Sequence, residues 1–110
     1  MNIDEWKSQL RRGTLEYCIL SLISKRDCYG YEIMCELSKF PIVSTKESTI
    51  YPLLRRLQHD DYLTSFWQET SEGLPSRKYY SITANGKEYL SLMSHEWENL
   101  TMAILYMKGE

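Results

Sequence analysis

An apolar seam near the C-terminal end of the chain restricts the fold more than any other feature of this sequence. Its side chains recur at spacings of three and four, the repeat with which one helix packs along another. The seam consists of Leu90, Met93, Trp97, Leu100, Ile104 and Met107. A globular domain could bury one such stripe internally, but we expect a second copy of the chain, and not a later segment, to cover it. We expect Trp6 and Leu10, near the other end of the sequence, to join this dimer interface.

The residues before the seam predict three helices and a hairpin. Apolar spacing indicates helices over residues 4–24 and 29–39, and a third helix that begins near residues 44–47. Ser44 and Glu47 fit a capping box for the third helix, although Thr45 could cap it instead. Segments 62–70 and 78–83 are rich in aromatic and β-branched residues and indicate two strands. Thr83 is expected to cap the last helix.

This order of elements is that of an α+β, mainly helical winged helix-turn-helix. The fold would consist of three helices and a two-stranded wing, followed by a C-terminal dimerisation helix. Residues 1–83 would form the winged helix-turn-helix domain, whose first helix joins the dimer interface, and residues 84–110 the dimerisation helix. The 110 residues fit one compact unit.

The composition argues against several other classes of protein. The three cysteines are an odd number, which excludes a closed disulfide framework within one chain, and neither they nor the two histidines have zinc-ligand spacing. No nucleophile has a neighbouring base and there is no Gly-rich phosphate loop, so we expect no enzyme, no cofactor and no metal. No apolar run approaches the ~20 residues that span a bilayer. No secretory signal begins the sequence, and a cytoplasmic protein is expected.

Three separated motifs resemble the PadR family of bacterial transcription regulators. They are residues 29–33 (YGYEI), 48–57 (STIYPLLRRL) and 77–83 (RKYYSIT), and the similarity runs from about Leu10 to the end of the sequence. The single short C-terminal helix is similar to that of the smaller members. The resemblance implies a dimeric repressor that binds inverted repeats and releases DNA in response to a small molecule or changed conditions. Lys46 and Glu47 depart from the small residues or proline common in the family, and Leu74-Pro75 replace glycines frequent in the wing tip.

The third helix would supply the residues that contact DNA bases. In helix-turn-helix proteins the second helix of the pair enters the major groove and presents its first turns to base edges. Here those residues are Lys46, Ser48, Thr49 and Tyr51, with Arg55 one turn further along. Hydroxyls can contact bases or phosphates, and a cation can pair with guanine. The alternative for Ser48 and Thr49 is that they only begin the helix.

Phosphate contacts are expected from residues outside the third helix. Arg77 and Lys78 lie in the predicted wing, although exposed pairs of this kind often serve only solubility. Tyr29 could bind a phosphate through its hydroxyl. Arg56 projects at a different angle from Arg55 and is expected to pair with Asp60, four residues further on.

Trp97 in the middle of the seam allows two interpretations. It could anchor the dimer interface, with its indole nitrogen bonded to Glu96 or to water. It could instead form, with Met93 and Trp6, a wall of an interface cavity for planar apolar ligands, as the family resemblance implies. Met107 is also adaptable enough to line such a cavity.

The sequence therefore predicts a sequence-specific, DNA-binding transcriptional regulator. We expect a homodimeric repressor that binds an inverted repeat in double-stranded DNA and is relieved by a small planar apolar effector or another signal. The net charge of −2 is unusual for a nucleic-acid-binding protein. It keeps open the alternative of a winged-helix adaptor that binds proteins and not DNA.

Overall fold

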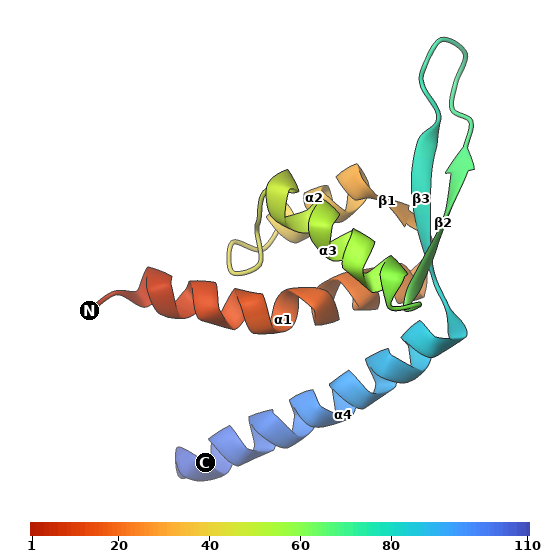
Figure 1. Cartoon of the computed structure of the whole chain (residues 1–110). Coiled ribbons are helices and arrows are strands. Elements are labelled where there is room, and N and C mark those ends of the chain that lie inside the picture. Colours follow the sequence, from red (N-terminus) through yellow and green to blue (C-terminus); the bar gives the residue numbers. More distant parts are fainter.

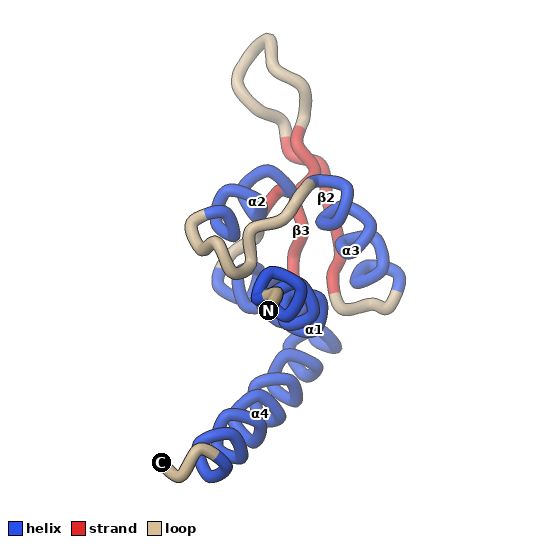
Figure 2. Tube along the Cα trace, turned by 90° about the vertical axis from the view of Figure 1, so that its left-hand side faces the viewer, coloured by secondary structure: helices blue, strands red, loops and turns tan.

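The computed structural model describes residues 1–110 and contains four helices and three short strands (Figure 1). The elements are α1 Ile3–Lys25, β1 Cys28–Tyr29, α2 Gly30–Ser38, α3 Glu47–His59, β2 Leu63–Gln68, β3 Arg77–Ile82 and α4 Ala84–Met107. The predicted fold, three helices and a hairpin followed by a C-terminal helix, is confirmed. Figure 2 shows the wing and α4 leaving the helical body on opposite sides. The chain is therefore elongated, with extents of 58 × 33 × 21 Å.

The sheet has three strands and not the two that the sequence predicted. Its order is β1-β3-β2, and both pairings are antiparallel. In β1, Cys28 pairs with Tyr80 and Tyr29 with Tyr79. A strand of two residues is too short to show an alternating pattern, and its partner lies about fifty residues away in the sequence. This strand joins the start of α2 to the wing.

The hydrophobic core lies between α1, α2, α3 and the base of the wing. Its buried side chains come from all of these elements: Leu15, Ile19, Leu20, Ile23, Cys28, Ile33, Leu37, Ile50, Leu54, Leu57, Leu63 and Tyr80. The apolar spacings that predicted α1, α2 and α3 coincide with these buried positions. In α1, the side chains of Ile3 and Trp6 are exposed. The first fully buried side chain of this helix is that of Leu15.

The predicted capping box of α3 is wrong. The helix begins at Glu47 with Lys46 at the cap, and no side chain caps it. The amides of Val43 and Ser44 both donate to the Phe40 carbonyl, which places Ser44 in the preceding turn. The first-turn amides of α3 therefore lack a side-chain acceptor.

The predicted ion pair between Arg56 and Asp60 is also wrong. Arg56 instead lies 2.9 Å from a carboxylate oxygen of Glu16, which belongs to α1. A contact across forty residues of sequence brings α1 and α3 together on one side of the core. It could not be foreseen from spacing along a single helix.

The helix α4 begins as predicted and then leaves the body. The Thr83 hydroxyl accepts a hydrogen bond of 2.9 Å from the Gly86 amide, which confirms the predicted cap. Near this end the Tyr89 ring stacks on Tyr62, with centroids 4.2 Å apart. Further along, Tyr17 of α1 donates a hydrogen bond of 3.0 Å to the Ser94 hydroxyl. None of the four helices is both long and apolar enough to cross a membrane.

Candidate nucleic-acid interface

A groove of about 410 Å³ lies where β1, the start of α2, α3 and the wing meet. The residues that line it come from all four elements: Tyr29, Gly30, Tyr31, Tyr51, Arg55, Trp67, Arg77, Lys78 and Tyr80. Five of them were predicted to contact DNA: Tyr29, Tyr51, Arg55, Arg77 and Lys78. The fold therefore brings together, in one groove, residues that are distant in sequence.

Three cations in this groove are free of carboxylates. Arg55, Arg77 and Lys78 take part in none of the ion pairs of the chain. The Arg77 guanidinium lies 4.7 Å from the centroid of the Tyr29 ring, and the Lys78 ammonium lies 5.7 Å from that of Tyr80. An aromatic face orients a cation without neutralising it. These three charges therefore remain available to an anion in spite of the acidic balance of the whole chain.

The aromatic side chains around these cations pack against one another. The Tyr79 ring meets Tyr29 edge-on at 5.3 Å and stacks on Phe66 at 5.7 Å. Burial is the main cause that raises the pKa of the Tyr80 phenol; Tyr51 raises it further, and Arg55 opposes both. A phenol is protonated at neutral pH even at its ordinary pKa, so the Tyr80 hydroxyl can donate a hydrogen bond.

Tyr51 owes its position to a missing side chain. A Cβ on Gly30 would lie 2.5 Å from the Tyr51 ring, closer than carbon atoms can approach. The glycine that opens α2 therefore lets the ring lie across the start of that helix. This explains why tyrosine and glycine occur in two motifs that are far apart in the sequence.

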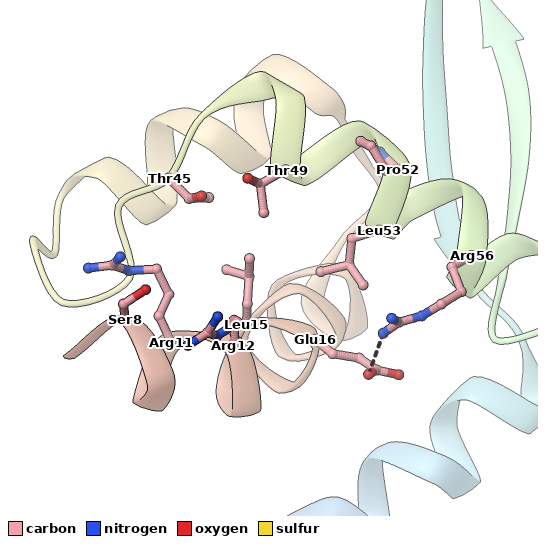
Figure 3. Close-up of a pocket in the computed structure, with 10 residues that line it drawn as sticks. All are labelled: Ser8, Arg11, Arg12, Leu15, Glu16, Thr45, Thr49, Pro52, Leu53 and Arg56. Carbon is pink, nitrogen blue, oxygen red and sulfur yellow. Dashed lines mark hydrogen bonds and ion pairs between the residues drawn. The ribbon is translucent and has the colours of Figure 1, made fainter. Parts of the chain in front are cut away.

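The remaining predicted residues lie at the start of α3. Lys46 is exposed at the cap, and Ser48 is exposed in the first turn. The Lys46 carbonyl accepts from the amides of Thr49 and Ile50, so the amides before them point out of the helix end unbonded. Thr49 itself does not line the groove. It faces α1 across a second cleft (Figure 3).

Sequence reasoning missed four members of the groove: Gly30, Tyr31, Trp67 and Tyr80. Trp67 lies opposite Lys78 in the register of β2 and β3, with 69% of its surface exposed. Knowledge of the β2–β3 register would have placed Trp67 and Tyr80 at the groove. The register depends, however, on the turn between the strands, and that turn has no short hairpin signature.

The seam of α4 is open along most of its length. Leu90 and Met93 are half-buried against the core, whereas Trp97, Leu100, Ile104 and Met107 are exposed. On α1, Trp6 is exposed and Leu10 half-buried. A single copy of the chain thus leaves a long apolar face uncovered.

The three residues predicted to bind a ligand are not all together. Met93 and Trp97 line a shallow pocket of about 230 Å³ between α1 and α4, together with Tyr17 and Leu100. The Trp97 and Tyr17 rings lie 6.1 Å apart and are tilted by 49°. Trp6 does not line this pocket. No hydrogen bond joins the Trp97 indole to Glu96.

Comparisons with known proteins give one consistent result. A family model described as the transcriptional regulator PadR-like family matches residues 19–92. An uncharacterized protein of Lysinibacillus sphaericus is 40% identical over 106 residues, which is 94% of this chain and 96% of that one. The negative transcriptional regulator PadR of Bacillus subtilis is 35% identical over 88 residues, covering 76% of this chain and 44% of that protein.

A solved structure is similar over nearly the whole chain. The crystal structure of a PadR-like transcriptional regulator from Bacillus cereus has a TM-score of 0.83 and 35% sequence identity. The alignment covers 93% of this chain and 98% of that one. It therefore spans the winged helix and the greater part of α4.

Proposed function

This chain belongs to the PadR-like family and is a transcriptional regulator, not an enzyme, and we propose that it acts as a homodimer that binds an inverted repeat in double-stranded DNA. The groove beside α3 carries this proposal, because Arg55, Arg77 and Lys78 meet there without a carboxylate partner. Cations on a wing commonly bind backbone phosphates, while the first turns of the preceding helix contact bases. A protein with this role works in the cytoplasm, with the DNA.

Each residue of the interface has a proposed role. Ser48, Tyr51 and Lys46 contact base edges from the exposed side of α3, and Thr49 reaches bases only from the edge of that surface. Arg77, Lys78 and the Tyr29 hydroxyl bind phosphate, and Arg55 binds either phosphate or guanine. The first-turn amides of α3 add hydrogen-bond donors for an anion.

The uncovered face of α4 supports the dimer. Leu100 exposes 50% of its surface and Trp6 on α1 exposes 57%, large values for side chains of this type. We propose that the seams of two copies pack together, with Trp6 and Leu10 contributing from α1. A two-fold axis would place the two α3 helices at half-sites about one DNA turn apart, roughly 34 Å.

We further propose that the protein represses transcription and that a small molecule relieves the repression. The Bacillus subtilis relative is named a negative regulator, which favours a repressor. The pocket formed by Tyr17, Met93 and Trp97 offers aromatic and flexible apolar surface, which suits a planar apolar effector. A second copy of the chain would deepen this pocket and bring its own Trp97 and Trp6 near it.

A DNA-binding assay tests the main proposal. In a mobility-shift experiment on the DNA upstream of its own gene, the parent protein should shift the fragment. Arg77→Ala should weaken binding to every sequence alike and reduce the slope of log K against log salt by about 1. Lys87→Ala, which removes an exposed cation from the start of α4, is the matched control. It should leave the affinity for DNA and the salt slope unchanged. No shift by the parent protein would favour the adaptor alternative.

Fluorescence tests the effector pocket. Planar apolar compounds should quench Trp97 and release DNA over the same concentration range, because a ligand shifts an equilibrium only by its differential affinity for the two states. Trp97→Ala should remove the response and weaken the dimer only in part. Phe variants of Trp6 and Trp67 isolate the optical signal. Planar compounds that neither quench Trp97 nor change DNA affinity would leave Trp97 as an interface anchor.

A further inference from the structure

A second cleft, of about 630 Å³, lies between α1 and α3 and is larger than the groove beside the wing. In Figure 3, Thr49 points from α3 toward α1, and Leu15 points back from α1. Most of the lining residues are polar, and they come from α1, from α3 and from the segment just before α3: Ser8, Arg11, Arg12, Leu15, Glu16, Thr45, Thr49, Pro52, Leu53 and Arg56. Neither the dimer nor the DNA contacts proposed above give this cleft a role.

The cleft has an excess of positive charge. It contains three arginines and one glutamate, and Glu16 is paired with Arg56 at 2.9 Å. Arg11 donates from Nε to the Ile42 carbonyl at 2.9 Å, which leaves its two terminal nitrogens free to bind. Arg12 forms no ion pair within the chain. Two uncompensated guanidinium groups therefore line one cleft in a chain whose net charge is −2.

The other lining residues suit an anion that carries an apolar part. The hydroxyls of Ser8, Thr45 and Thr49 can donate hydrogen bonds to oxygens. Leu15, Pro52 and Leu53 form the apolar surface beside them. We propose that this cleft binds a small organic phosphate, with the phosphoryl group held by Arg11 and Arg12 and the apolar part on Leu53 and Pro52. A phosphoryl dianion matches two guanidinium groups and accepts several charge-assisted hydrogen bonds at once.

The cleft lies on a different side of α3 from the DNA groove. Thr49 and Tyr51 are two residues apart, so their side chains project about 160° apart on a helix. Leu53 and Arg56 share the side of Thr49, whereas Arg55 shares that of Tyr51. A small molecule fits this position better than a DNA strand does.

The position of the cleft gives its occupant a regulatory role, which rests on the proposed function. One wall is α1, proposed to join the dimer interface, and the other is α3, proposed to contact bases. A bound phosphate would change the angle between these helices and so the separation of the two α3 helices in the dimer. The occupant acts as an effector only by binding the DNA-bound and free arrangements with different affinities.

Ligand binding can be tested without DNA, with phenyl phosphate as the probe. In a phosphate-free buffer of low ionic strength, phenyl phosphate should raise the Tm, because a ligand of the native state stabilises it. In the Trp97→Ala variant, which lacks the proposed effector pocket, phenol carries no charge for the arginines and should not raise it. Arg12→Ala should weaken binding by about tenfold, measured by calorimetry, and Arg12→Lys should restore part of the affinity. Lys87→Ala makes the same change in net charge outside the cleft and should bind as the parent does.

The outcomes separate this inference from the proposed function. Equal affinity of the parent and Arg12→Ala for phenyl phosphate, or an equal effect of phenol in the Trp97→Ala variant, would overturn the cleft as a phosphate site. If Arg12→Ala instead loses DNA affinity and salt dependence in the absence of any probe, the arginines bind the DNA backbone and the inference is wrong. Phenyl phosphate that binds through Arg12, in a protein that shifts no DNA, would refute the DNA-binding role and leave the site standing.

Discussion

The winged-helix body and α4 differ in where their apolar side chains lie. The twelve core residues all come from the part of the chain between Leu15 and Tyr80. In α4 only Gly86 is buried, although the helix is 24 residues long and carries an unbroken apolar seam. The body is therefore stabilised by its own packing, whereas most of the α4 seam is left exposed in a single chain. The proposed dimer could therefore change how its two copies associate without unfolding the proposed DNA-binding groove.

The largest effect is expected in the body. Leu54 is completely buried, and Leu54→Ala should lower the free energy of unfolding by about 2–5 kcal/mol, from lost burial and the cavity left behind. Leu92→Ala on α4, where 61% of the side chain is exposed, should change it by less than about 0.5 kcal/mol. Urea unfolding followed by circular dichroism measures both. Similar losses in the two variants would mean that the body and α4 do not differ as described.

A smaller effect, of a different kind, is expected in the seam. Leu100→Glu places a carboxylate in the proposed dimer interface and should weaken association by on the order of 3 kcal/mol, roughly a hundredfold in Kd. Sedimentation should find mainly dimer for the parent and mainly monomer for the variant at micromolar concentration. Leu92→Glu, off the seam, is the control and should remain dimeric. A parent protein that sediments as a stable monomer would contradict the proposed use of this face.

The smallest of the three effects concerns the junction between the two regions. A methyl group on Gly86 would overlap the Tyr62 carbonyl oxygen and press on Ile82, so Gly86→Ala should destabilise the chain by about 1–3 kcal/mol. Gly13→Ala is a matched control in α1, because a Cβ there meets nothing within 4 Å. Since alanine favours helix more than glycine does, that variant should gain up to about 1 kcal/mol. Thermal unfolding that gives both variants the same sign would refute the close contact at Gly86.

Features set by local spacing could be predicted from the sequence, and features set by distant partners could not. Periodicity found all four helices, and the Thr83 cap followed from a residue type next to an apolar run. The strand β1 and the Arg56–Glu16 pair were missed because each partner lies forty or more residues away. The Ser44 cap failed because a turn that begins at Phe40 takes up that residue.

The candidate interface was predictable in its residue types and not in their arrangement. Arg55, Arg77 and Tyr51 were identified from the sequence, and the fold places them in one groove. Thr49 comes from the same short motif, but its position on the helix turns it toward α1. A sequence motif does not show which side of a helix each residue occupies until the packing of that helix is known.

Under the proposed function, the short strand β1 sets how much DNA one copy of the chain would cover. Through the pairing of Tyr29 with Tyr79, and a bond of 3.1 Å from the Tyr29 amide to Glu32 of α2, the wing is joined to the helix-turn-helix. The wing is therefore tied to α2, which shares the core with α3, and we expect the spacing between two copies to vary more than the spacing between the wing and α3. Operators bound by this protein should consequently tolerate little variation in the length of each half-site. Any variation that they do tolerate is expected in the spacer between the half-sites.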